Sequence, residues 1–330
     1  MRFAPSKEQE HFGASLRDLL DAAEVPAVAR AWALDDFAAG RQLWKRLGEA
    51  GVTALGLTRT QGGYGADAVD LVIGFLELGR AAVPGPFVES AAVLPVLLGE
   101  PAHADPQRVA AHAETLAALA EGDLMATVAI PPEVPFAVDA GAADAIFLVQ
   151  HDRLMSATAT TEVGSVDRAR RLAEVSATAE VAQRVETAAA CDMGALATAA
   201  QILGAGDAVL RRATEYATQR RQFGRPIGQF QAVKHQLADA MVGLELARPL
   251  LFGAAVSVTA QASTARRDIS AAKLACTSAA YRASRASLQV HGAIGYTAEY
   301  DLSLWLTKIR ALVSSWGTAR VHRSRVLDAI

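Results

Sequence analysis

The feature that most constrains the fold is helical periodicity in the C-terminal half of the chain. Apolar residues recur at three- and four-residue spacing from Ala195 to Arg220, from Gln231 to Ala262 and from Arg267 to Val290. This spacing places apolar side chains on one face of a helix. Because the connections between the three stretches are short, neighbouring helices must run antiparallel. The sequence therefore predicts a helical bundle, completed by the segment after Tyr300.

The N-terminal third shows helical spacing too, from Ser6 to about Ala120. Two segments interrupt it, the glycine-rich stretch Thr60–Gly65 and the Pro84-Gly85-Pro86 sequence. Glycine permits backbone conformations that a Cβ atom forbids, and proline ends helical hydrogen bonding. We therefore expect amphipathic helices separated by loops.

The pattern changes between about Leu124 and Val185, where short apolar runs of the β type occur at Met125–Ile130 and Ala145–Val149. A small strand-containing region fits this pattern. The sequence thus predicts a mostly α protein with three domains. These are an N-terminal helical domain (1–122), a reduced β middle domain (123–186) and a C-terminal four-helix bundle (187–330).

Composition narrows the range of partners. The chain has 330 residues and a formal net charge of −3, with acidic and basic residues interspersed, which argues against a nucleic-acid partner. No uncharged apolar run approaches the roughly 20 residues that cross a bilayer. The N-terminus lacks the basic and apolar regions of a secretory signal. We expect no nucleic-acid or membrane partner and a cytoplasmic location.

Metal and redox motifs are weak. Cys191 and Cys276 lie far apart inside helical patterns, without the spacing of a zinc site or a redox dithiol. Glu8/His11 and Glu100/His103 have the three-residue spacing of metal-binding helices, but the second pair encloses Pro101. We predict no metal site.

A nicotinamide site is also disfavoured. The Gly204-Ala205-Gly206 sequence lacks the third glycine of a dinucleotide-binding loop and lies within a helical pattern instead of following a strand. We therefore expect it to belong to a helix.

Three segments in order resemble the acyl-CoA dehydrogenase family, and the resemblance spans nearly the whole chain. The likeness is weakest in the middle region. The segments are Leu43–Gly51 with the Gly62–Gly65 loop, Arg220–Ile227 with Phe230-Gln231, and Gln289–Thr297.

The resemblance implies FAD as cofactor, and acyl-CoA as substrate. In the family, the last two segments reach across a dimer interface to the ADP half of the neighbouring subunit's FAD. A guanidinium can hold a pyrophosphate, and glycine lets the backbone approach a ligand closely. By this resemblance the cofactor-binding residues are Arg220, Gln222, Phe223, Phe230, Gln231, Gln289 and Gly292.

The family's general base is absent. Most members carry a glutamate before Gly-Thr near the C-terminus, and an ungapped count places that position at Trp316. Other members carry it at the start of the first bundle helix, where this chain has Gly194. Neither side chain accepts a proton, so we assign no catalytic residue. Thr307-Lys308 also departs from the family's arginine-aspartate pair, and the flavin-contacting stretches of the middle domain are missing.

This pattern favours a division of labour between subunits. The resemblance is to the non-catalytic subunit of heteromeric, steroid-degrading actinobacterial acyl-CoA dehydrogenases. It implies a homologous partner that carries the glutamate, an α2β2 assembly, and an electron-transferring flavoprotein as acceptor. The isolated chain is then expected to be inactive.

Two other interpretations stay open. The chain could be a self-sufficient homomeric enzyme with a different base, for which Asp192 is the candidate, although an acid at that position is typical of a helix N-cap. It could instead be a flavin-free structural paralogue. His235 and His291 are assigned no proton transfer, although His291 lies beside the last glycine motif.

Overall fold

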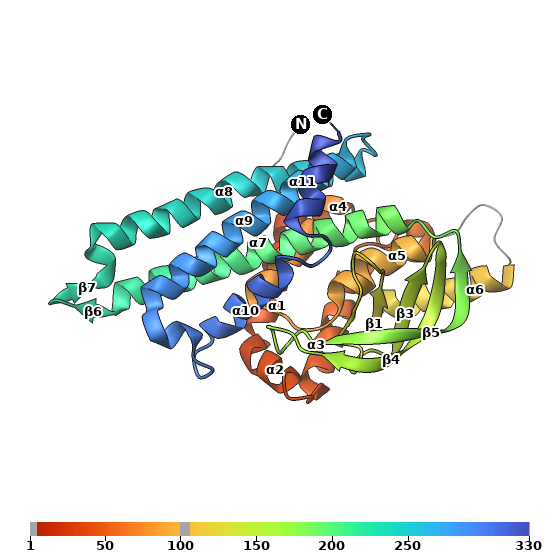
Figure 1. Cartoon of the computed structure of the whole chain (residues 1–330), viewed down its shortest axis with the longest axis horizontal. Helices are drawn as coiled ribbons and strands as arrows, with labels where there is room; N and C mark the ends of the chain where they lie inside the picture. Colours follow the sequence, from red (N-terminus) through yellow and green to blue (C-terminus); the bar gives the residue numbers. More distant parts are fainter. Residues whose placement is uncertain (1–4, 100–105, 330) are drawn as a thin grey trace.

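The computed structural model describes residues 5–99 and 106–329. The order of elements is helices, then a small sheet, then long helices (Figure 1). The N-terminal helices are α1 (Lys7–Asp21), α2 (Val25–Trp32), α3 (Ala38–Glu49), α4 (Ala68–Ala81), α5 (Leu94–Leu97) and α6 (Pro106–Ala120), with a π-helical segment at Val88–Val93. The strands are β1 (Ala126–Ala129), β2 (Ala137–Val138), β3 (Ala145–Gln150), β4 (Arg153–Val163) and β5 (Leu172–Gln183). The C-terminal part holds α7 (Thr187–Gln219), the hairpin β6 (Arg221–Gln222) and β7 (Arg225–Pro226), α8 (Gln231–Thr259), α9 (Ala265–His291), α10 (Leu302–Leu312) and α11 (Ala319–Leu327).

This arrangement confirms the mostly α fold with a small sheet and a C-terminal bundle. Both expected strands exist, as β1 and β3, and both expected interruptions are loops. The bundle helix α7 begins at Thr187, next to Glu186, where helical spacing resumes in the sequence. Its first turns are alanine-rich, and alanine favours helix without marking a face. The division into three domains stays a prediction.

The sheet has the strand order β1-β3-β4-β5-β2. Strands β1 and β3 pair in parallel, whereas the other pairs are antiparallel. All four residues of β1 are buried, while β4 and β5 are mostly exposed or half-buried and bury only Leu154, Ala173 and Ala182. Antiparallel strands commonly leave one face in solvent. The sheet is therefore packed against the helices through its β1–β3 side.

Helices α4 and α7 approach each other closely through glycine. A Cβ atom at Gly79 would lie 1.9 Å from the Gln201 carbonyl oxygen, and one at Gly204 would lie 2.0 Å from the Leu76 carbonyl oxygen. The Gly204-Ala205-Gly206 sequence is thus a helix-packing site inside α7, as expected, and has no role as a nucleotide loop.

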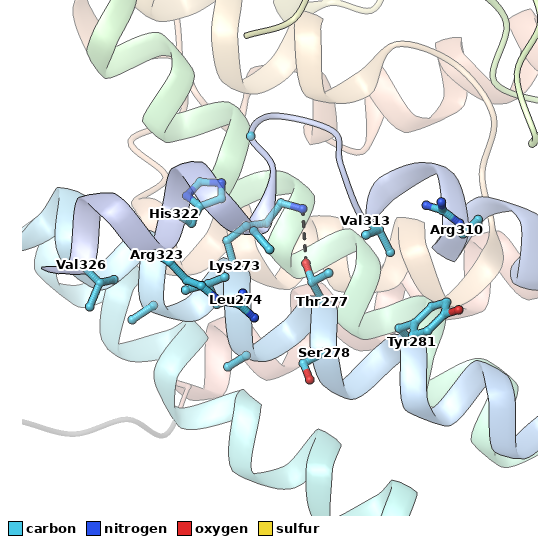
Figure 2. A pocket seen from close by; sticks show the side chains of 14 residues that line it. Lys273, Leu274, Thr277, Ser278, Tyr281, Arg310, Val313, His322, Arg323 and Val326 are labelled. Carbon is cyan, nitrogen blue, oxygen red and sulfur yellow. Dashed lines mark hydrogen bonds between the residues drawn. The ribbon is translucent and has the colours of Figure 1, made fainter.

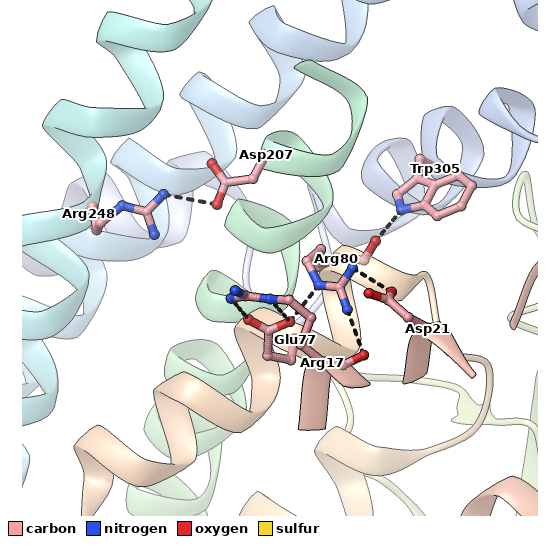
Figure 3. A network of polar contacts seen from close by, with 7 residues as sticks. All are labelled: Arg17, Asp21, Glu77, Arg80, Asp207, Arg248 and Trp305. Atoms are coloured by element: carbon pink, nitrogen blue, oxygen red, sulfur yellow. Dashed lines mark hydrogen bonds and ion pairs between the residues drawn. The ribbon is translucent and has the colours of Figure 1, made fainter. Parts of the chain in front are cut away.

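Polar contacts join the same helices to α1, α8 and α10 (Figure 3). Glu77 of α4 is buried and accepts hydrogen bonds from Arg17 of α1 and from Arg80. The Trp305 indole of α10 donates to the Arg80 carbonyl oxygen at 2.9 Å. Because each buried donor and acceptor is paired, the network costs little desolvation and fixes how these helices sit.

Two helices, α7 and α8, are long and apolar enough to cross a membrane by length and composition alone. In α7, 83% of the apolar window is buried inside the protein, which is typical of a core helix, but in α8 only 39% is buried. The exposed apolar residues of α8 are Met241, Val242, Leu246 and Leu250. Helix α8 therefore presents an apolar face that its own chain does not cover.

Of the two Glu/His pairs with metal-ligand spacing, the structure describes one. Among the residues that the structure describes, no group of three or more His, Cys, Asp or Glu side chains is placed to hold a metal ion. The Glu8/His11 pair lies in the first turns of α1. Glu100/His103 lies outside the described residues.

Lys308 links the three parts of the molecule. Its side chain is 4% exposed, and its Nζ donates to the Val83 carbonyl oxygen at 3.2 Å and lies 3.5 Å from Asp167 Oδ2. Asp167 belongs to the β4–β5 connection and is also buried. The departure from the family's arginine-aspartate pair at Thr307-Lys308 therefore has a structural use, because the lysine neutralises a buried carboxylate of the sheet region.

We predict that Lys308→Met lowers the free energy of unfolding by about 3 kcal/mol, because it leaves the Asp167 carboxylate buried without a counter-charge. Chemical denaturation would measure the change. Lys45→Met is the matched control, since Lys45 and Asp123 form a solvent-exposed pair that solvent screens, so its loss should change stability little. Equal effects of the two substitutions would contradict the assignment.

Candidate functional site

The hairpin after α7 forms an exposed tip of the molecule (Figure 1). Gln222 pairs with Arg225, and the two turn residues between them, Phe223 and Gly224, have φ angles of 50° and 79°. Positive φ at both positions is typical of tight two-residue hairpins, where glycine fits and phenylalanine is rare. Phe223 is nevertheless 91% exposed. An apolar ring held in a strained, solvent-facing position indicates a contact outside this chain.

The predicted cofactor-binding residues lie at this same end of the bundle. The α7 and α9 ends pack together through Ala213, Ala217 and Val290, and the Tyr216 ring stacks on His291 with centroids 4.3 Å apart. Six of the predicted residues are exposed and the seventh, Phe230, is partly buried; the exposed ones are Arg220, Gln222, Phe223, Gln231, Gln289 and Gly292.

The two aromatic rings of the hairpin region face each other edge to face. The centroids of Phe223 and Phe230 are 6.1 Å apart, with the ring planes perpendicular. The guanidinium of Arg225 lies 4.2 Å from the Phe230 centroid, in a cation–π contact. The surface thus combines flat apolar faces with cationic donors.

Gly292 meets the requirement for close approach. Its φ of 66° and ψ of −146° lie in a region that only glycine adopts readily, and nothing lies within 4 Å of the position where a Cβ would be. The backbone here is open to a ligand or a partner chain.

The two histidines have structural or solvated positions. His291 is buried and its Nδ1 lies 2.8 Å from the Ser287 carbonyl oxygen, and burial lowers the pKa of its imidazole. His235 is exposed on α8. His291 therefore serves to join α7 and α9 beneath the glycine motif, which fits the absence of an assigned proton transfer.

The two positions where the family carries its base meet in space. Trp316 is 4% exposed, and a Cβ atom at Gly194 would lie 2.3 Å from the indole ring. The indole thus rests on the bare backbone of α7. Trp316 holds this place with a φ of 56°, an unfavourable conformation for a bulky residue. The space beside both positions is filled by the ring itself.

Glu89 is a carboxyl group in contact with Trp316, and the sequence did not predict it. It lies in the π-helical segment, is 3% exposed, and accepts a hydrogen bond from the Trp316 indole N–H at 3.3 Å. Burial raises the pKa of the Glu89 carboxyl, which favours its neutral form. The available signal was a single acid inside the apolar run Phe87–Leu94.

Glu89 has no room for a substrate beside it. It lines a cavity of about 20 Å³, together with Asp139, Thr198, Lys308 and Trp316. That volume suits about one water molecule. Trp316 separates the cavity from a larger one of about 460 Å³ between the β-region loops and α10. An acyl chain cannot reach Glu89 in this arrangement.

Asp192, the candidate base of the homomeric alternative, is engaged by arginines. Its Oδ1 accepts from Arg325 at 3.1 Å, and its Oδ2 lies 3.8 Å from Arg266. Helix α7 begins at Thr187 with Glu186 as the preceding residue. The expectation that Asp192 is an N-cap is therefore wrong, because Asp192 lies inside α7.

Comparisons with known proteins agree with this geometry. The family model of the acyl-CoA dehydrogenase N-terminal domain matches residues 6–103, and that of the C-terminal domain matches residues 184–330. Acyl-CoA dehydrogenase IpdE2 of Mycobacterium tuberculosis is 32% identical over 314 residues, covering 92% of this chain and 91% of the relative. The chain belongs to the acyl-CoA dehydrogenase family.

Solved structures show the same fold over the whole chain. Butyryl-CoA dehydrogenase of Megasphaera elsdenii has a TM-score of 0.82 at 20% identity, covering 100% of this chain and 99% of that one. The ChsE4-ChsE5 complex of Mycobacterium tuberculosis has a TM-score of 0.83 at 21% identity, covering 99% and 98%.

FAD is the cofactor of this family, and the exposed end of the bundle fits it. Arg220 and Gln289 offer donors with no partner among the described residues, Phe223 offers an aromatic face, and Gly292 offers open backbone. Such groups suit a pyrophosphate and a flat ring. When bound, FAD would supply the hydride acceptor of the dehydrogenation, and these residues would bind and orient it.

We predict that Gly194→Ala lowers the free energy of unfolding by about 2 kcal/mol, because the new methyl group overlaps the Trp316 indole. In a Trp316→Ala background the same change should cost nothing or stabilise the helix. A double-mutant cycle by denaturation measures the coupling. Gly243→Ala in α8 is the control, since its Cβ would meet only ordinary contacts at 3.8 Å.

A second prediction concerns Asp139, which is 1% exposed and accepts from the Trp32 indole at 3.1 Å and the Arg171 N–H at 2.9 Å. Burial raises the pKa of Asp139 from 3.8 to about 6. A raised acid pKa means that the folded state binds the proton more tightly, so stability is lost as the pH rises through 6.

Asp139→Asn should therefore stabilise the protein relative to wild type by roughly 3 kcal/mol at pH 7.5, at about 1.4 kcal/mol per pKa unit. The difference should shrink steadily toward pH 4. Melting temperatures of both proteins between pH 4 and 7.5 would measure it. A difference independent of pH would contradict the assigned cause.

Proposed function

We propose that this chain is the non-catalytic subunit of a heteromeric FAD-dependent acyl-CoA dehydrogenase. It would complete the FAD site of a homologous subunit that carries the glutamate base. The observation that carries the proposal is the contact of Trp316 with Gly194, since one aromatic ring fills the place beside both base positions.

The reaction itself supports this reading. Removal of a proton beside a thioester carbonyl needs a positioned base, which typically supplies on the order of 10²- to 10⁴-fold in rate. Glu89 is buried behind Trp316, and Asp192 is paired with two arginines. Neither carboxyl can meet a substrate carbon, which weakens the homomeric alternative.

The exposed end of the bundle supports the binding role. The Phe223 ring has no burial in its own chain, and Arg220 has no partner among the described residues. In a flavin-free paralogue, nothing would explain why the strained Phe223 ring is exposed beside the Arg220 guanidinium. The uncovered apolar face of α8 supports association with another subunit, because exposed apolar patches mark interfaces.

The finer assignment follows the relatives. The relative IpdE2 is an acyl-CoA dehydrogenase, and the ChsE4-ChsE5 structure is that of a complex. We extend this to an α2β2 assembly in the cytoplasm that oxidises a bulky, steroid-type acyl-CoA and passes electrons to an electron-transferring flavoprotein. The domain boundaries 122/123 and 186/187 belong to the same proposal.

The decisive experiment purifies the chain alone and together with the homologous partner. We expect flavin absorbance and acyl-CoA dehydrogenation from the pair and neither from the lone chain. Native mass spectrometry would count chains and flavins in the same sample. Full flavin loading with dehydrogenation by the lone chain would refute the proposal.

We further predict that Arg220→Ala in this chain raises the dissociation constant of FAD from the pair about 10-fold, since a hydrogen bond from a charged donor is worth roughly 1.5 kcal/mol or more. Phe223→Ser should act in the same direction through lost ring contact. Flavin retention on gel filtration measures both. Leu34→Ser, at another exposed apolar residue, should leave flavin content unchanged, and unchanged FAD content in all three would favour the flavin-free paralogue.

A further inference from the structure

A cavity of about 740 Å³, partly open to solvent, lies away from the hairpin and from Glu89. It is lined by α9, α10 and α11 (Figure 2). Its volume falls within the range of small-molecule sites, roughly 300–1,000 Å³. Neither the two base positions nor the predicted FAD-binding residues line it. Gly317, the residue after Trp316, lies at its edge.

The walls of this cavity are apolar. Aliphatic side chains come from all three helices, among them Leu274, Val313 and Val326. Lys273 is buried at the inner side, where its Nζ donates to the Leu312 carbonyl oxygen at 2.9 Å and lies 3.4 Å from Thr277 Oγ1. The lysine is thus held by the protein, and the free volume needs an apolar occupant.

Two cationic side chains flank the cavity. Arg310 of α10 and Arg323 of α11 lie on opposite sides of it in Figure 2. Neither guanidinium has a hydrogen-bond or ion-pair partner within the described residues. The hydroxyl groups of Ser278 and Tyr281, which can both donate and accept, are also on the lining, and no Asp or Glu lines the cavity. Two guanidinium groups with no carboxylate beside them favour an anionic head group.

We infer that this cavity binds an amphipathic carboxylate, with the head group held by Arg310 or Arg323 and the hydrocarbon body between α9 and α11. The class is a free acid with an aliphatic or polycyclic body. The site is separate from the FAD contacts at the hairpin, so it would be a second ligand site on this subunit.

The test uses isothermal titration calorimetry of the full chain, alone and paired with its partner. The probes are decanoate, its neutral analogue decanol, and ADP. We expect decanoate to bind with 1:1 stoichiometry and at least about 10-fold more tightly than decanol, because charge-assisted hydrogen bonds hold the head group. ADP should not displace decanoate.

Variants locate the site. Arg310→Gln combined with Arg323→Gln should weaken decanoate binding about 10-fold and leave decanol binding unchanged. Ala275→Phe should fill the cavity and abolish binding of both probes, whereas Arg285→Gln and Ala110→Phe, at exposed positions outside the lining, should change neither. Circular dichroism shows whether Ala275→Phe folds. If it does not fold, the double arginine variant alone tests the site.

Three results would overturn the inference. They are no heat with decanoate, equal affinity for decanol, or displacement of decanoate by ADP, which would make the cavity a nucleotide site. Flavin content of the pair is recorded in the same samples, so loss of flavin at the hairpin and loss of carboxylate binding at this cavity remain separate observations.

Discussion

The packing of the Trp316 ring on the backbone of Gly194 is the contact on which the character of this molecule depends. Any side chain at position 194 would collide with the indole, and any smaller side chain at 316 would leave a void between α7 and the α10–α11 connection. The indole also donates to Glu89, which keeps a buried carboxyl paired. The position that would serve proton abstraction in a catalytic relative thus serves core packing here.

Charges behind this ring are arranged for stability. Lys308 neutralises Asp167 and joins the bundle to the sheet region, while Asp139 ties Trp32 of α2 to Arg171 before β5. Such groups are costly to bury unless their partners are fixed. They therefore hold the three parts of the chain in one arrangement, which in turn positions the ends of α7 and α9 side by side.

At the ends of α7 and α9, polar groups are exposed and lack partners among the described residues. Buried charges such as Glu77 and Lys308 have partners inside the protein, but the hairpin and the Gln289–Gly292 segment leave donors, an aromatic ring and open backbone in solvent. Strain at Phe223 persists because the long helices beneath it fix both ends of the turn. Exposed binding groups at one end of the bundle, together with a buried Trp316 at the base position, are consistent with the proposal that two different subunits form one active site.

Sequence periodicity located the bundle, the first strands and the loops well, because amphipathic helices and alternating strands leave a regular apolar pattern. It gave Asp192 as a helix cap, although Asp192 lies inside α7, because the alanine-rich first turns of this helix carry little pattern. Glu89 and Asp139 were missed because a lone acid in an apolar run says nothing about which indole it will meet. The position of Arg310 and Arg323 beside a cavity could not be predicted, because the cavity forms only where separate helices pack together.

The amino-acid sequence alone determined that tryptophan and glycine, which cannot accept a proton, stand at the two positions where the family resemblance expects the base. It also determined the order of helices and strands, because local periodicity is a property of neighbouring residues. Only the tertiary structure decided that Trp316 and Gly194 pack against each other, that Glu89 is buried behind them, and that three helices line a cavity flanked by arginines with no partner among the described residues. These facts depend on contacts between residues far apart in the chain, which no local pattern records.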